Sequence, residues 1–187
     1  MNISFALMLL VLTASRLSAQ PAEWMVRADK SGSLLTCSLQ EGAASYGGST
    51  QTLTGQGWYR HSPRIERVVI RGIIADFGTG HPADDAVQLR KLQGLTYPDL
   101  VTTGDLLDEP GGQVLAGTVL FGGVIYPFRQ PADVTIRGGQ QIIECVILVG
   151  PIGVPTRINW PGRAKRRLRV GFMVSFPVPP AGQLTLN

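Results

Sequence analysis

The sequence is poor in the residues from which most catalytic and metal-binding sites are built. Only two histidines, His61 and His81, occur in 187 residues, and histidine is a frequent general base and metal ligand near neutral pH. The nucleophile pattern Gly-x-Ser-x-Gly and the glycine-rich phosphate loop are both absent from the sequence. We therefore expect a non-enzymatic protein that holds neither a catalytic metal ion nor a cofactor.

One cluster of metal-ligand residue types does occur, at the start of a predicted helix. His81, Asp84 and Asp85 lie within five residues of one another and together offer three ligands. Carboxylates in the first turn of a helix more often stabilise its amino end, and we favour that role for Asp84 or Asp85. A metal-dependent enzyme centred on His81 is the less favoured alternative.

Cysteine is also rare. Cys37 and Cys145 are the two in the chain, and an exported protein with an even number of cysteines could pair them. A bridge would close a loop of roughly 100 residues and stabilise the fold by up to ~4.7 kcal/mol. Two small buried residues in separate strands are an equally good interpretation, and the sequence leaves both open.

Long apolar runs are absent beyond the first residues of the chain. Residues 5–12 are apolar, residues 14–19 are mostly small, and Gln20-Pro21 follows, an order typical of a secretory signal peptide. The run is shorter than the ~20 apolar residues that span a bilayer. We expect a signal peptide over 1–19 and a single domain over 20–187, exported to the periplasm or the extracellular space without an integral membrane segment.

Short apolar segments recur along the rest of the chain, with glycine and proline between them, as is typical of antiparallel sandwiches and barrels. Near the C-terminal end the side chains alternate, so that Val170, Phe172, Val174 and Phe176 share one face. This pattern predicts an all-β fold of about eight strands. The predicted strands are 34–39, 57–60, 67–74, 114–121, 124–128, 133–137, 142–149 and 168–176.

A single helix is predicted over residues 82–94. Proline stands at its start, acidic residues in its first turn, and glycine at its end. We expect Val87 or Ala86, together with Leu89 and Leu92, to form its buried side. A helix of this length should pack on the barrel as a lid or plug.

The segment 117–128 predicts a tight β-hairpin. Gly122-Gly123 supplies the positive φ angles that a two-residue turn requires, and valine and phenylalanine on either side favour strands. Pro127 has no N–H to donate, so we expect the second strand to lie at a sheet edge or to bulge there.

The hairpin segment resembles a motif of the YceI-like family of secreted, lipocalin-like barrels. Five residues coincide with that motif in register: Gly117, Thr118, Gly123, Val124 and Pro127. A second match, in the family's order, is formed upstream by Thr79-Gly80, Asp85, Leu89-Arg90 and Tyr97-Pro98. The resemblance implies an antiparallel lipocalin-like β-barrel with one short helix, which binds a long isoprenoid or other lipid chain in its interior.

A closed sheet of about eight strands encloses space for side chains or for one small ligand. The residues that we expect to line this space and to contact an isoprenoid or fatty chain are Val68, Ile70, Val119, Phe121, Ile147, Phe172, Val174 and Phe176. The alternative is that the same residues fill the barrel as an ordinary core. A filled barrel would favour a secreted structural module that binds a partner through its surface.

Positive charge is concentrated near the C-terminal end of a chain whose net charge is +4. The residues of this basic run are Arg163, Lys165, Arg166, Arg167 and Arg169. Such a run attracts anionic lipid or nucleic acid, but it is more often a solvated turn, which is our prediction. Export makes nucleic acid an unsuitable partner, and the sequence predicts no oligomeric state.

Overall fold

The computed structural model describes residues 24–60, 62–152 and 166–179. The strands in these ranges are β1 (Trp24–Arg27), β2 (Asp29–Glu41), β3 (Ala44–Thr50), β4 (Leu53–Tyr59), β5 (Arg67–Ile73), β6 (Asp99–Glu109), β7 (Gly112–Phe121), β8 (Val124–Arg137), β9 (Gln140–Ile152) and β10 (Arg166–Pro177). The helices are the 3-10 helix η2 (Ile74–Asp76) and α2 (Pro82–Lys91). Neither of these two helices is long and apolar enough to cross a membrane. The signal peptide predicted for residues 1–19 lies outside the described residues.

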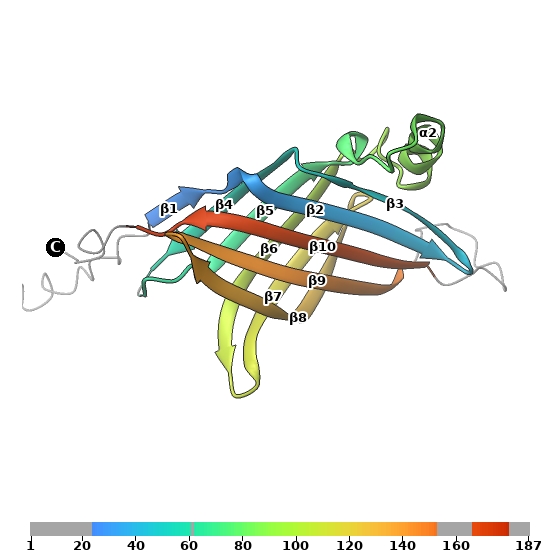
Figure 1. Cartoon of the computed structure of the whole chain (residues 1–187). Coiled ribbons are helices and arrows are strands. Elements are labelled where there is room, and N and C mark those ends of the chain that lie inside the picture. The colour runs from blue at the N-terminus through green and yellow to red at the C-terminus, as the bar shows by residue number, and fades with distance from the viewer. Residues whose placement is uncertain (1–23, 61, 153–165, 180–187) are drawn as a thin grey trace, which may run out of the picture.

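The strands form an antiparallel sheet in the order β1-β4-β5-β6-β7-β8-β9-β10-β2-β3. Figure 1 shows this sheet folded into two layers, with β2, β10 and β9 crossing in front of β4 to β7. The ladder does not close between β1 and β3, but β1 and β2 are separated only by Ala28, whose N–H donates to the Gly55 carbonyl at 2.9 Å. The chain thus passes from one layer to the other between β1 and β2. On the opposite side of the barrel it does so along β8, which pairs first with β7 and then with β9. The predicted lipocalin-like architecture is confirmed, with ten strands instead of about eight.

The facing sides of the two layers form one apolar core. The predicted alternation on β10 is confirmed, since Val170, Phe172, Val174 and Phe176 are buried while Arg169 is exposed. Two predicted strands, 124–128 and 133–137, are parts of the single strand β8. Three observed strands, β1, β3 and β6, lie outside the predicted segments.

The predicted hairpin is present and joins β7 to β8. Gly122 and Gly123 adopt φ angles of 58° and 75°, and Phe121 pairs with Val124 directly across the turn. The ring of Tyr97 packs against the second glycine, because a Cβ placed on Gly123 would lie 2.6 Å from a ring carbon. The hairpin is thereby fixed to the loop that follows α2.

The helix α2 differs from the prediction in what it covers. It begins at Pro82 as predicted but ends at Lys91, and none of its ten residues is buried. Val87 is 49% exposed, so its predicted inward position is wrong, and Ala86 is exposed as well. Leu92, which follows the helix, is buried in the core as expected. The helix contacts β3 and lies beside that strand, outside the two layers, in Figure 1. Only Leu89 of the helix packs against the core, so α2 covers the barrel from outside and does not enter it.

Asp85 has a different role from the one favoured by the sequence. Its carboxylate accepts hydrogen bonds from the backbone N–H and the hydroxyl of Thr79, at 2.8 and 2.7 Å. These bonds lower the pKa of Asp85. The N-cap residue His81 makes no capping bond with its side chain. Asp85 therefore stabilises the loop ahead of the helix instead of the amino end of the helix.

The two cysteines are free thiols, so the disulfide alternative is wrong and the alternative of two buried residues is confirmed. Cys37 on β2 and Cys145 on β9 flank β10, where they pair with Val170 and Phe172. Two strand spacings of about 4.8 Å already separate them by more than the ~7 Å that a disulfide allows between Cα atoms. Burial raises the pKa of Cys37 to about 12 and that of Cys145 to about 11.

The basic run is not a solvated turn where the structure describes it. Arg166, Arg167 and Arg169 lie in β10, whereas Arg163 and Lys165 lie outside the described residues. The strand continues into the run because Leu168 is fully buried between Arg167 and Arg169. The alternation of β10 therefore determines which arginines face outwards.

Candidate ligand-binding interior

The structure brings together all eight residues predicted to line the barrel. They belong to four strands, β5, β7, β9 and β10, and to a single apolar cluster. None of them is more than 5% exposed. The residues are Val68, Ile70, Val119, Phe121, Ile147, Phe172, Val174 and Phe176. Their interior position is confirmed, while their contact with a ligand stays a prediction.

One end of this interior is closed by hydrogen-bonded polar side chains. The hydroxyl of Tyr59, at the end of β4, donates to the carbonyl of Pro177 at 3.0 Å, and burial raises the pKa of Tyr59 to about 12. Gln141, fully buried at the start of β9, accepts the Ile65 N–H at 3.1 Å. These bonds hold the end of β10 and the loop before β5 across the barrel, so this end offers no apolar entry.

The seam between β8 and β9 is only half paired. β8 pairs with β7 over residues 124–131 and with β9 over residues 132–137, where Ala132 opposite Cys145 is the last pair. Beyond that pair, β9 continues along β10 alone. The two strands therefore part at Ala132, and we call this place the β8–β9 fork.

The sequence of β8 explains where the strands part. In a two-residue hairpin the closing pair, Phe121 and Val124, is hydrogen-bonded, and the bonded pairs then alternate along the ladder. By this alternation the backbone nitrogens of Pro127 and Pro131 point away from β7, towards the side on which β9 lies. Proline has no N–H to donate, so two of the donors that would join β8 to β9 are missing. The predicted edge position of Pro127 is thus confirmed for this half of the strand.

The inner face of β8 is less buried than those of its neighbours. Alternate residues of β9 and β10 are buried, but of the core-facing residues on β8 only Phe128 is. Tyr126 is half-buried, and burial raises its pKa. Across the fork, Val149 of β9 is 8% exposed, as is Phe128. These are the highest exposed fractions among the buried apolar residues, so the interior is least covered along the parted half of this seam.

A surface hollow of about 490 Å³ lies at the apex of the fork. It is lined by residues of both strands on either side of the last pair, namely Pro131, Ala132, Asp133, Glu144, Cys145 and Val146. The thiol of Cys145 donates to the carbonyl of Pro131 at 3.5 Å, which satisfies a backbone group that lacks a β9 partner. The sequence signal for this site is the pair of prolines four residues apart in β8, Pro127 and Pro131, of which the hairpin pattern singles out only Pro127.

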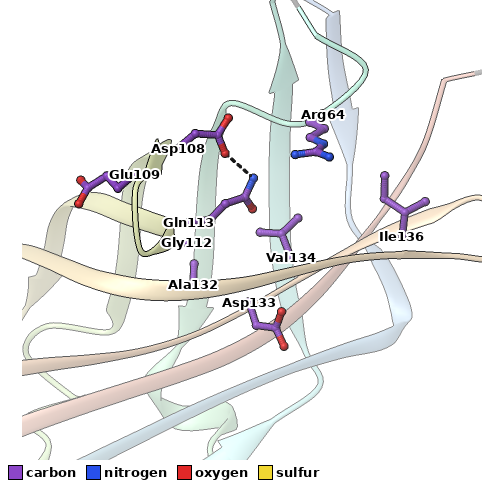
Figure 2. A pocket seen from close by; sticks show the side chains of 9 residues that line it. All are labelled: Arg64, Asp108, Glu109, Gly112, Gln113, Ala132, Asp133, Val134 and Ile136. Atoms are coloured by element: carbon purple, nitrogen blue, oxygen red, sulfur yellow. Dashed lines mark hydrogen bonds between the residues drawn. The ribbon is translucent and has the colours of Figure 1, made fainter.

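A second groove, of about 560 Å³, lies between the turn of the β6–β7 hairpin and the end of β8. Figure 2 shows Asp108, Glu109 and Asp133 around it, with Arg64 on the far side and Gln113 donating to Asp108 at 2.9 Å. Charged and amide groups of this kind remain hydrated. The groove therefore does not suit an apolar chain.

The residues that carry the family resemblance have structural roles. The matched segments contact each other through Tyr97 and Gly123, and Thr79 is bonded to Asp85 within the upstream match. A Cβ on Gly117 would lie 2.0 Å from the carbonyl oxygen of Thr103, so the close approach of β7 to β6 requires glycine. These contacts position the hairpin that leads into the fork.

The same fold occurs in two solved structures. BcnA from Burkholderia cenocepacia matches with a TM-score of 0.60 at 15% sequence identity, over 79% of this chain and 98% of BcnA. A polyisoprenoid-binding domain from Saccharophagus degradans, implicated in plant cell wall breakdown, matches with a TM-score of 0.53 at 12% identity, over 85% of this chain and 99% of that domain. No family profile and no curated protein matches the sequence. The resemblance to the YceI-like family is thus confirmed as a likeness of fold.

Proposed function

We propose that this protein is an exported, non-enzymatic binding protein that holds a long apolar chain, an isoprenoid or another lipid, inside its barrel. The observation that carries the proposal is the β8–β9 fork, a half-paired seam beside an interior that is lined mostly by apolar side chains. The fold shared with a polyisoprenoid-binding domain supports the same ligand class. Export rests on the signal-like first 19 residues.

A chain that enters at the fork would first contact Phe128, Tyr126 and Val149. Each methylene removed from water contributes ~0.8 kcal/mol, so about ten buried methylenes would supply ~8 kcal/mol before the cost of ordering the chain is subtracted. Binding of this kind requires neither a cofactor nor a catalytic group. It does require that the core side chains move apart, because all eight predicted lining residues are packed in this structure.

That close packing favours a second candidate function. If the core does not open, the protein is a secreted structural module that binds a partner through its surface. The two candidates differ in whether the interior takes up an apolar molecule.

The test uses a fluorescent polyene fatty acid as an apolar probe. We expect the protein to bind it and Phe172→Arg to abolish binding, because a charge in the interior excludes an apolar chain. Ile125→Arg is the matched control, since Ile125 is 65% exposed on the outer face of β8, and it should bind normally. If Phe172→Arg does not fold, the nearly isosteric Val119→Thr should still weaken binding. A folded wild-type protein that takes up no probe would contradict the proposal and favour the packed module.

A further inference from the structure

The outer face of β10 carries a groove that the proposed interior site does not explain. Its volume is about 680 Å³. It extends from β9 across β10 to β2 and β3, and is lined by Ser38, Gln40, Ser45, Leu148, Val149, Gly150, Arg167, Leu168 and Arg169. Two arginines of the basic run, Arg167 and Arg169, lie on this surface.

The groove is cationic. Arg167 and Arg169 are two residues apart on one strand, so their side chains leave the same face roughly 7 Å from each other. Both are exposed, and none of the lining residues named above is acidic. Arg166, on the opposite face of β10, is instead paired with Glu41 at 2.9 Å. The alternation of the strand thus separates one neutralised arginine from two that have no ion pair among the described residues.

Small residues make room for these arginines. A Cβ on Gly150 would lie 3.1 Å from the Cγ of Arg167, so the stem of that arginine lies over bare backbone on β9. On the other side, Arg169 pairs with Ser38 and Arg167 with Gln40. Hydroxyl and amide groups therefore border the guanidinium groups and can donate to the same anion.

Apolar side chains are exposed next to the charges. Leu148 pairs directly with Arg169 and is 61% exposed, and Val146, two residues further along β9, is 41% exposed. A guanidinium pair suits phosphate oxygens, and adjacent exposed leucine and valine suit acyl chains. Nucleic acid would match the charge but not these apolar side chains.

We propose that this outer face binds the phosphate groups of anionic lipids and so docks the protein on a membrane surface. The inference rests on the proposed function, because a protein that holds lipid in its barrel needs a place to contact the membrane that supplies or receives the lipid. The arginines would bind headgroups, and Leu148 would enter the layer below them. The fork opens at Cys145 of the same β9 strand, three residues from Leu148.

The experiment is sedimentation of the mature protein with vesicles. Wild type should sediment with phosphatidylcholine vesicles that contain about one quarter phosphatidylglycerol, but not with pure phosphatidylcholine, and about 1 M salt should release it. Arg167→Gln/Arg169→Gln should weaken partitioning about 10- to 30-fold, since each basic residue near such a surface contributes up to about fivefold. Arg27→Gln/Arg137→Gln is the matched control, because it removes the same charge from exposed residues elsewhere and should bind as wild type does.

Three outcomes would overturn the proposal: equal loss in both double variants, binding of soluble glycerophosphate without vesicle binding, or binding of an oligonucleotide in preference to vesicles. The polyene probe separates this proposal from the proposed function. Arg167→Gln/Arg169→Gln should keep the probe affinity of wild type, because both arginines lie outside the barrel. Loss of vesicle binding with the probe site intact would support the docking face specifically.

Discussion

Single residues set the conformations on which the candidate site depends. Gly123 has no Cβ and so leaves room for the Tyr97 ring. Pro127 and Pro131 have no backbone N–H, so the edge of β8 lacks two hydrogen-bond donors. The polar side chains of Tyr59 and Gln141 close the opposite end of the barrel. Each of these effects follows from a property of one side chain or its absence, so each is open to substitution.

The Gly122-Gly123 and Gly138-Gly139 turns allow the contribution of the Tyr97 contact to stability to be separated from backbone strain. Gly123 and Gly139 have φ angles of 75° and 74°, but a Cβ on Gly139 meets nothing within 4 Å, whereas one on Gly123 meets the Tyr97 ring. We expect Gly139→Ala to lower the free energy of unfolding by ~1–2 kcal/mol from backbone strain alone. Gly123→Ala should lose a further ~1–3 kcal/mol through the clash. Urea denaturation measures both, and equal losses would mean that Tyr97 does not hold the hairpin.

The buried thiols predict a pH dependence of stability. Both have a pKa raised above the ordinary 9.0, so between pH 9 and about 11 the unfolded chain loses protons that the folded protein keeps. The free energy of unfolding should therefore fall as pH rises in this window, by up to ~1.4 kcal/mol per pH unit for each thiol. The stability contribution is fully present below pH 9.

Urea denaturation at several pH values across this window measures the slope. The matched variant, Cys37→Ala/Cys145→Ala, should be less stable throughout because it loses core contacts, but its slope should be shallower. An identical slope in the variant would show that the thiols are not the groups that titrate.

At the scale of elements, the fork follows from the composition of β8. Replacing both prolines, in Pro127→Val/Pro131→Val, restores two N–H groups on the side towards β9. We expect the ladder to extend beyond Ala132, with ~0.5–1.5 kcal/mol of added stability per hydrogen bond formed and slower uptake of the polyene probe. Ile125→Val, which restores no donor, is the control. Unchanged amide exchange along β9 together with unchanged uptake would contradict the role assigned to the prolines.

The elements that the sequence predicts well are those with one buried apolar face. β5, β7, β9 and β10 alternate clearly, because most of their inward residues are large and apolar, namely valine, isoleucine, leucine or phenylalanine. β3 is mostly serine, glycine and alanine, and β6 places Thr102 and Gly104 on its inward face, so neither shows an apolar period. For α2 the prediction holds at the C-terminal end, where Leu92 is buried and Leu89 is half-buried, but it is wrong for Val87 and Ala86, because the helix packs against the core only at that end.

At the scale of the whole molecule, two layers enclose an apolar interior with unequal boundaries. One end is held by hydrogen bonds to Tyr59 and Gln141, and one seam is left unpaired at the fork. All eight lining residues were predictable from alternation and family resemblance, since burial of an apolar strand face depends on local pattern. The fork and the outer groove were not, because both arise where residues from separate strands meet in the folded sheet.

The central claim is that the barrel holds a long apolar chain. Native mass spectrometry of the protein purified from its own exported fraction tests this claim most directly, followed by organic extraction and identification of the released material. We predict a mass above that of the mature polypeptide and the release of an isoprenoid or fatty chain. A clean polypeptide mass with nothing extracted would contradict the claim and identify the barrel as a packed core.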